Sequence, residues 1–171
     1  RIYVDENIFE KFIDAFKTQT EKYILDNPLD ESTNLGPVVK VSAANSIRNQ
    51  VSNAIQNGAK NIIDNSKFSI DNSDNCYVAP SALINVDHSM EFMREETFGP
   101  TVGIMKVKNE QDAAKLMNDS PYGLTASIWT SDKEFASKFG NEIQTGTFFM
   151  NRCDYLDPGL AWTGVKDTGM G

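Results

Sequence analysis

The sequence contains few of the residues that build metal sites and histidine-based catalytic relays. Its 171 residues include one histidine, His88, and two cysteines, Cys76 and Cys153, which lie far apart without metal-ligand spacing. A zinc site or a two-histidine relay needs more ligands than these. We therefore predict no metal site. Two widely separated cysteines also favour a reducing compartment, such as the cytoplasm, over a disulfide-rich secreted fold.

Long apolar runs and clusters of positive charge are also missing. No run approaches the roughly 20 apolar residues that a membrane-spanning helix needs, and no targeting segment is recognisable among residues 1–171. The net charge of −8 argues against nucleic acid or an anionic membrane as a partner. A hydrophobic content of 40% is ordinary for a globular protein. We expect residues 1–171 to form a single domain.

Strands and helices alternate in the later half of the sequence. Val102–Val107, Leu124–Thr130 and Thr147–Met150 are apolar runs typical of buried strands. Asn109 is placed to cap a helix after the first run, and Ser131-Asp132-Lys133-Glu134 is a capping box for a helix after the second. This βαβαβ order predicts the class α/β, with the three strands mutually parallel in one sheet flanked by helices.

The earlier half contains two amphipathic helices and further extended segments. Asp5 is placed to cap the first helix. Apolar residues recur at helical spacing within Ser42–Gln56, and Gly58 fits a left-handed stop after it. Tyr77–Val86 is extended, and Pro80 should confine it to a sheet edge or a bulge.

The most informative stretch is Glu95-Glu96-Thr97-Phe98-Gly99-Pro100, which precedes a predicted strand. The Gly-Pro pair fixes a sharp entry into that strand. Glu96 and Phe98 share strand parity, so both side chains should lie on one face. A carboxylate there can accept two hydrogen bonds from a ribose diol, and the ring can press on a flat heterocycle. The alternative is a surface acidic pair followed by a core phenylalanine.

The segment Asn151–Gly171 leaves the last strand without clear periodicity. Open parallel sheets bind ligands beyond the carboxyl ends of their strands, so this segment is expected to line a site. Arg152 and Asp157 are better explained as surface or packing residues. The candidate site-lining residues are Asn151, Arg152, Asp154, Tyr155, Asp157 and Trp162.

Glu95 to Pro100 resembles the E-E-[IT]-F-G-P signature of the aldehyde dehydrogenase superfamily. Further segments resemble that family in the same order, and the likeness covers essentially the whole chain. It is confined to the later part of such an enzyme, namely the C-terminal part of the catalytic domain. The segments are Arg1-Ile2-Tyr3-Val4, Asn27-Pro28-Leu29-Asp30, Leu35-Gly36-Pro37, Ala54 to Lys60, Tyr122-Gly123-Leu124-Thr125-Ala126, Gly146-Thr147 and Gly164 to Gly171.

The resemblance implies a parent enzyme that oxidises an aldehyde to a carboxylate with NAD or NADP. In this family a cysteine thiolate attacks the aldehyde, the thiohemiacetal passes a hydride to the cofactor, and a glutamate-activated water cleaves the thioester. The nucleophile, the general base and the cofactor-binding domain precede the position matched by Arg1. We therefore expect no catalytic residue within the chain, and no activity from the chain alone. Cys153 is a poor substitute nucleophile, because Asp154 beside it disfavours a second negative charge.

By the same resemblance, Glu96 would hold the nicotinamide ribose and Phe98 would contact the nicotinamide end of the cofactor. Asn151, Cys153, Leu156 and Trp162 would lie near the aldehyde tunnel. The partners implied are an aldehyde, the remainder of the same polypeptide and further copies of the enzyme in a homo-oligomer.

Two other functions stay open at this stage. The chain could be a stand-alone α/β binding or assembly module without chemistry. It could also be a cysteine hydrolase, which would need Cys153 and His88 in one cleft.

Overall fold

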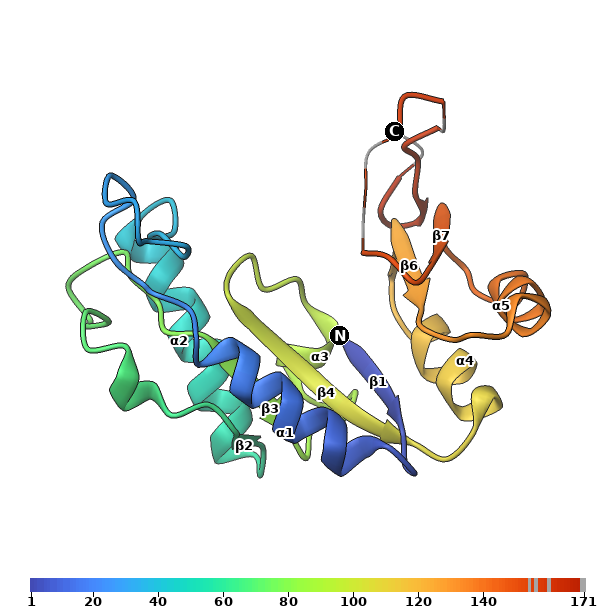
Figure 1. The fold of residues 1–171 in the computed structure, drawn as a ribbon, viewed down its shortest axis with the longest axis horizontal. Helices are drawn as coiled ribbons and strands as arrows, with labels where there is room; N and C mark the ends of the chain where they lie inside the picture. The colour runs from blue at the N-terminus through green and yellow to red at the C-terminus, as the bar shows by residue number, and fades with distance from the viewer. Residues whose placement is uncertain (154, 156, 160, 170–171) are drawn as a thin grey trace. The chain divides into compact units, whose positions relative to one another are not determined.

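The computed structural model describes residues 1–153, 155, 157–159 and 161–169. The chain divides into two compact units, Arg1–Lys106 and Val107–Gly171, and both contain strands and helices (Figure 1). That residues 1–171 form one domain stays a prediction.

The first unit contains β1 (Ile2–Asp5), α1 (Phe9–Thr20), α2 (Val41–Gln56), β2 (Lys60–Asn61), η1 (Asn65–Lys67), β3 (Ser81–Ile84), α3 (Glu91–Arg94) and β4 (Thr101–Val107), whose last residue opens the second unit. The second unit continues with α4 (Glu110–Asn118), β5 (Tyr122–Gly123), β6 (Thr125–Ile128), α5 (Lys133–Gly140), β7 (Thr147–Met150) and β8 (Val165–Lys166).

The sheet of the first unit has the strand order β1-β4-β3-β2. Strands β3 and β4 run parallel, with Ser81 opposite Thr101. Strands β2 and β3 run antiparallel, so the sheet is mixed, and the α/β class is confirmed. Pro80 was wrongly expected to mark an edge. It directly precedes β3, an inner strand, and therefore removes no hydrogen bond from the ladder.

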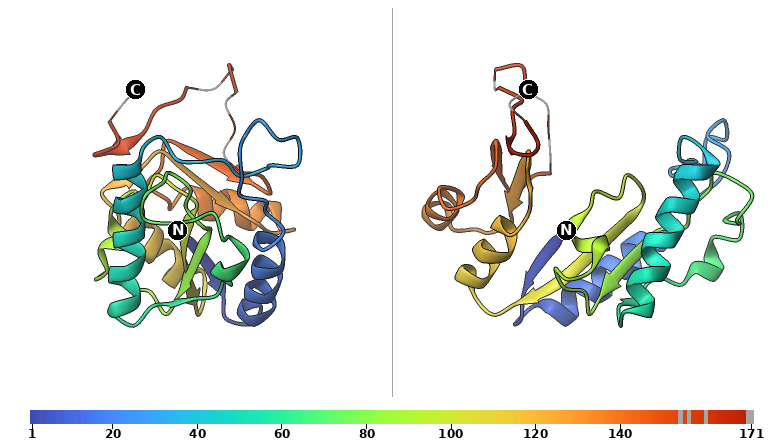
Figure 2. Two further views of the ribbon diagram at one scale, coloured as in Figure 1. Left: turned by 90° about the vertical axis from the view of Figure 1, so that its left-hand side faces the viewer. Right: turned by 180° about the vertical axis from the view of Figure 1, so that it is seen from behind.

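Helices cover both faces of this sheet. Successive residues of β3 point to opposite faces, so Ala82 packs in one cluster with α1, whereas Leu83 packs in another with α2 and α3. Both residues are buried, at 1% and 0% exposure. The left view of Figure 2 shows the sheet between α2 and α1. This two-sided burial explains the continuous apolar strand sequences.

The ends of the two long helices test the predicted caps. Gly58 has φ +103°, and its N–H donates to the Ile55 carbonyl while the Ala59 N–H reaches the Ala54 carbonyl. This is the Schellman pattern, which confirms the predicted stop after α2. The predicted cap at Asp5 is wrong. Asp5 accepts a hydrogen bond from the backbone N–H of Asn7 at 2.8 Å and forms a turn of its own, so α1 begins after Ile8.

In the second unit, β6 and β7 pair in parallel from Thr125 opposite Thr147 to Ile128 opposite Met150. The expectation that β4 shares their sheet is wrong, because β4 has strand partners on both sides, β1 and β3. Helices α4 and α5 contribute the buried Ala114 and Phe139 to the core of this unit. The sequence patterns also missed β8, which pairs antiparallel with β5.

Helices α4 and α5 of the second unit each begin at a residue whose side chain caps the helix. The side chain of Asn109 accepts from the Asp112 N–H at 2.9 Å, which confirms the predicted cap of α4. In α5 the cap is Asp132, which accepts from the Phe135 N–H at 2.9 Å, one residue later than the predicted Ser131. No helix in the described part of the chain is long and apolar enough to cross a bilayer.

Candidate functional site

The loop from Glu95 to Pro100 connects α3 to β4 and is fixed where it begins. The guanidinium of Arg1 donates from Nε to the Met93 carbonyl at 2.5 Å and from Nη2 to the Arg94 carbonyl at 2.6 Å. These carbonyls belong to the end of α3 and need partners outside the helix. The start of β1 thus holds the point at which the loop leaves α3.

Helix α2 supports the middle of the same loop. The Thr97 hydroxyl hydrogen bonds to the side-chain oxygen of Gln50. Gly99 lies so close to Ile47 that an added Cβ would collide with the Ile47 Cδ1 atom. Ser81 N–H then donates to the Pro100 carbonyl at 3.0 Å, which starts the pairing of β3 with β4. The loop is therefore held at its start, middle and end.

Glu96 and Phe98 are the residues that this support leaves exposed. Glu96 is exposed, Thr97 is partly buried, and Phe98 has 86% of its surface accessible. Thr97 is held against α2 while both its neighbours are exposed, which agrees with the expected alternation; that Glu96 and Phe98 share one face stays a prediction. The alternative of a core phenylalanine at position 98 is wrong. Packing within the first unit gives no reason for an aromatic residue here.

The arrangement suits a ligand with a diol and a flat ring. A carboxylate can accept hydrogen bonds from two neighbouring hydroxyl groups, and an exposed aromatic face can stack on a heterocycle. Because the backbone between them is braced, the two groups would change position little on binding. The residues present therefore fit the ribose and nicotinamide portions of a dinucleotide.

The second group of predicted site residues belongs to the second unit. Asn151 follows β7 with φ +54°, a conformation that asparagine tolerates. Its side-chain oxygen accepts a hydrogen bond from the Thr130 N–H at 2.9 Å, and its side-chain nitrogen donates one to the Thr130 carbonyl at 2.8 Å. Asn151 thus ties the end of β7 to the residues after β6.

The other residues of this group are less constrained. Cys153 is exposed, and 39% of the Trp162 surface is accessible. Leu156, also predicted to line the tunnel, lies outside the described residues. The chain is anchored again beyond Trp162, where the Thr163 carbonyl lies against Gly146 too closely for any Cβ at position 146. Asn151 and Thr163 are therefore both held against other parts of the second unit.

Arg152 is the residue whose surroundings the sequence patterns did not reveal. Its guanidinium carbon lies 4.2 Å from the centre of the Tyr155 ring and 5.8 Å from that of Phe149. Both distances are within the range of cation–π attraction. The signal in the sequence was an arginine with aromatic residues three positions before and after it.

The cysteine-hydrolase alternative needs His88 to act on the Cys153 thiol. Nε2 of His88 is hydrogen bonded to the Tyr3 hydroxyl at 2.9 Å, so this nitrogen already has a partner within the first unit.

Among the described residues, no three or more His, Cys, Asp or Glu side chains gather where they could hold a metal ion.

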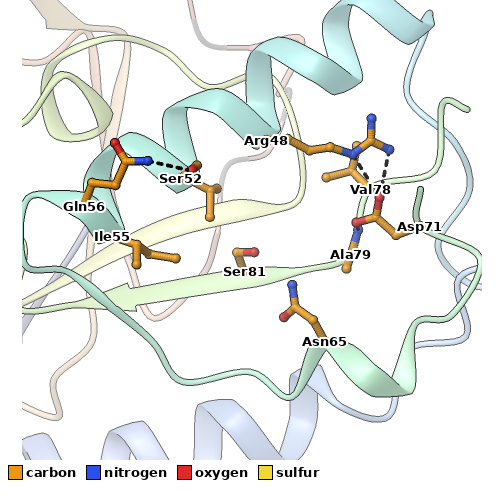
Figure 3. Close-up of a pocket in the computed structure, with 10 residues that line it drawn as sticks. Arg48, Ser52, Ile55, Gln56, Asn65, Asp71, Val78, Ala79 and Ser81 are labelled. Carbon is orange, nitrogen blue, oxygen red and sulfur yellow. Dashed lines mark hydrogen bonds and ion pairs between the residues drawn. The ribbon is translucent and has the colours of Figure 1, made fainter. Parts of the chain in front are cut away.

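A pocket of about 250 Å³ lies between α2 and β3 (Figure 3). Its charged groups, Arg48 and Asp71, are used by the fold. Nε and Nη2 of Arg48 donate to Asp71 Oδ1 at 2.9 and 2.8 Å, and Nη2 also donates to the Tyr77 carbonyl at 2.7 Å. The second Asp71 oxygen accepts from the Ala79 N–H at 2.8 Å. These groups fasten the loop before β3 to α2, which leaves the pocket without a charged group for a ligand.

Comparison with known proteins agrees with this architecture. A sequence profile of the aldehyde dehydrogenase family matches residues 1–171, and the chain belongs to that family. The chain is 34% identical over 173 residues to a 3-sulfolactaldehyde dehydrogenase of Priestia aryabhattai, covering 100% of this chain and 35% of the relative. It thus spans about a third of the length of the curated relatives it matches.

Solved structures show the same fold. Betaine aldehyde dehydrogenase from Staphylococcus aureus in complex with NAD+ superimposes with a TM-score of 0.90 at 31% identity, covering 100% of this chain and 34% of that one. Succinic semialdehyde dehydrogenase from Streptococcus pyogenes in complex with NADP+ gives a TM-score of 0.91 at 27% identity, covering 99% of this chain and 36% of that one.

Proposed function

We propose that the chain is the C-terminal part of the catalytic domain of an NAD(P)-dependent aldehyde dehydrogenase that oxidises an aldehyde to a carboxylate. Membership of the family supports the reaction class. The observation that carries the proposal is the outward-facing Glu96–Phe98 pair on a loop supported by α2 and Arg1.

In this proposal Glu96 and Phe98 hold the cofactor. Glu96 accepts hydrogen bonds from the hydroxyls of the ribose next to the nicotinamide, and the Phe98 ring contacts the nicotinamide end. The cofactor supplies the hydride acceptor when it is bound. Orientation of the reacting partners contributes much of an enzyme's rate, so the bracing of this loop serves the hydride step.

Asn151, Cys153, Leu156 and Trp162 line the path of the aldehyde in this proposal. Asn151 acts through the backbone, because its amide is engaged with Thr130 and shapes the start of the segment. Cys153 is exposed and contributes to the lining without acting as the nucleophile. The nucleophilic cysteine, the general base and the dinucleotide-binding domain come from the remainder of the polypeptide, and the enzyme works as a homo-oligomer.

The test compares residues 1–171 with the complete polypeptide that contains them. We expect the complete protein to reduce NAD or NADP in the presence of aldehydes. The absorbance of the reduced nicotinamide measures this reaction. The 171 residues alone should produce no reduced cofactor, because the nucleophile and base lie elsewhere.

Two results would count against this function. A complete protein that oxidises no member of a broad aldehyde panel would favour the binding or assembly module. Steady cofactor reduction by residues 1–171 that disappears in Cys153→Ser would place the nucleophile within the chain.

A further inference from the structure

The side chain of Arg152 is held in place by aromatic rings. Its guanidinium stacks on Tyr155 at 4.2 Å and lies 5.8 Å from the Phe149 ring. Phe149 is a buried residue of β7, so one of the two rings is fixed by the core of the second unit. Within the described part of the chain, no hydrogen bond or ion pair engages this guanidinium.

Stacking leaves the binding edge of a guanidinium available. The rings contact its faces, whereas its five N–H donors point outward in the plane of the group. That edge matches the two oxygens of a carboxylate, or two oxygens of a sulfonate, in a bidentate pair. A side chain already held by aromatic rings also loses less conformational freedom when it binds.

Arg152 follows the second strand of a parallel pair. Strands β6 and β7 are parallel, and Arg152 lies two residues beyond the carboxyl end of β7. Ligands of open parallel sheets bind beyond this end. The next residue is the exposed Cys153, which the proposed function places on the aldehyde path. In a chain with a net charge of −8, one fixed positive charge here changes which substrates can approach.

We propose that Arg152 determines specificity for anionic aldehydes, by pairing with a carboxylate or sulfonate on the substrate away from its aldehyde carbon. This inference rests on the proposed function and adds the charge of the substrate to it. Two relatives act on aldehydes of this kind by their names, 3-sulfolactaldehyde and succinic semialdehyde, but betaine aldehyde is cationic. The family fold alone therefore leaves the substrate charge open, and Arg152 decides it.

The experiment uses the complete enzyme with two aldehydes of equal chain length, anionic succinic semialdehyde and neutral butanal. In Arg152→Gln, the ratio of kcat/KM for succinic semialdehyde to that for butanal should fall about ten- to a hundredfold, as expected for the loss of a charge-assisted pair. Most of the fall should come from KM, because the pair contributes to binding before the hydride step. Raising the salt concentration should reduce the same ratio in the native enzyme.

Three further variants separate charge, shape and position. Arg152→Lys keeps the charge but loses the planar fork, so the ratio should fall less than in Arg152→Gln. Tyr155→Leu keeps the charge but removes the nearer stacking ring, and should give a fall of intermediate size. Lys133→Gln removes a positive charge from an exposed residue of α5 and should leave the ratio as it is in the native enzyme.

The outcomes distinguish this inference from the function on which it rests. A complete enzyme that oxidises both aldehydes, with the same ratio in Arg152→Gln as in the native protein, overturns the role of Arg152 and leaves the proposed function standing. A native ratio that favours butanal also overturns it. If the complete protein oxidises neither these nor other aldehydes, the proposed function fails, and the inference fails with it.

Discussion

The two loops to which we assign cofactor and substrate contacts, one in each unit, are held in different ways. In the first unit, Arg1 holds the end of α3 from which residues 95–100 depart, and the loop itself contacts α2 through Thr97 and Gly99 and β3 through Pro100. In the second unit, the chain after β7 is held at Asn151, by hydrogen bonds to Thr130, and again at Thr163, by its approach to Gly146. Arg152, which follows Asn151, stacks on the Tyr155 ring and lies near the Phe149 ring.

This difference suits the two tasks that we assign to the loops. The nicotinamide and its ribose are common to NAD and NADP, so the residues that hold this part of the cofactor benefit from a fixed backbone. In a substrate-facing segment, exposed side chains can be substituted with little effect on the packing of the fold. Loops on a rigid scaffold commonly carry such variable specificity. The comparison therefore predicts that substitutions in the first loop affect both stability and the hydride step, whereas those in the second affect substrate choice.

The largest effect is expected for Glu96→Gln in the complete enzyme. This change keeps the size of the side chain but removes the charge that accepts the ribose hydrogen bonds. Hydride transfer should slow by roughly ten- to a hundredfold, since hydrogen bonds to charged groups contribute about 1.5–3 kcal/mol. The burst of reduced cofactor in a stopped-flow experiment measures this step.

Glu91→Gln is the matched control, because Glu91 is an exposed glutamate in α3, just before the loop. It should leave the burst at the native rate. A native burst rate and native cofactor affinity in Glu96→Gln would remove Glu96 from the site and weaken the contrast between the loops.

A matched pair of glycine substitutions tests the contrast in stability. Gly99→Ala places a methyl group against Ile47 and should lower the free energy of unfolding by about 1–3 kcal/mol, the usual cost of overpacking. At Gly159 the nearest atom to an added Cβ is Asp157 Oδ1 at 3.2 Å, the end of a flexible side chain. Gly159→Ala should therefore change stability by less than about 0.5 kcal/mol. Urea denaturation followed by circular dichroism compares the two.

The second substitution at this contact is Ile47→Val, which removes the colliding Cδ1 atom. Combined with Gly99→Ala, it should cost less than the sum of the two single changes. Equal costs for Gly99→Ala and Gly159→Ala would show that the two loops are constrained alike.

Asn151 offers a way to loosen one end of the second loop. Asn151→Gly removes both hydrogen bonds to Thr130 and should cost about 1 kcal/mol, since these groups are exposed. Asn151→Ala should cost about 1 kcal/mol more, because alanine disfavours the φ of +54°. Faster hydrogen exchange at the Thr130 amide would report the lost anchor. Native exchange at this amide in both variants would mean that other contacts hold the segment.

The smallest loss of a native contact is expected for Thr97→Val, which keeps the shape of the side chain but removes the hydroxyl. Loss of the hydrogen bond to Gln50 should lower the free energy of unfolding by about 0.5–1.5 kcal/mol. Thr97→Ser retains the hydroxyl and should behave more like the native protein. If Thr97→Val matched the native protein in denaturation, the brace from α2 would rest on Gly99 alone.

Local features of the fold could be predicted from sequence because they depend on neighbours along the chain. The stop at Gly58, the cap at Asn109 and the strand Thr147–Met150 follow from backbone conformation and from side chains within a few residues. The exposure of Glu96 and Phe98 on either side of the partly buried Thr97 agrees with the period of an extended backbone. Where two neighbouring residues could serve equally, as Ser131 and Asp132 could, the prediction missed the cap by one position.

Strand partners were decided by tertiary structure. The apolar pattern of Val102–Val107 predicts a buried strand but cannot tell which strands adjoin it, because every buried strand offers the same backbone donors and acceptors. The fold places β4 between β1 and β3, which excludes β6 and β7 from its edges. Pairing of β8 with β5 likewise joins segments that are far apart in the sequence.

The chemistry of the site divides in the same way. The sequence by itself determined the family, the paired carboxylate and ring, and the absence of enough histidines and cysteines for a metal site. Only the tertiary structure determined that Thr97 is held by Gln50, 47 residues away in the sequence, and that Arg152 stacks on Tyr155. Side-chain identity sets what a residue can bind, but packing between distant segments sets where that side chain is held and which of its groups face solvent.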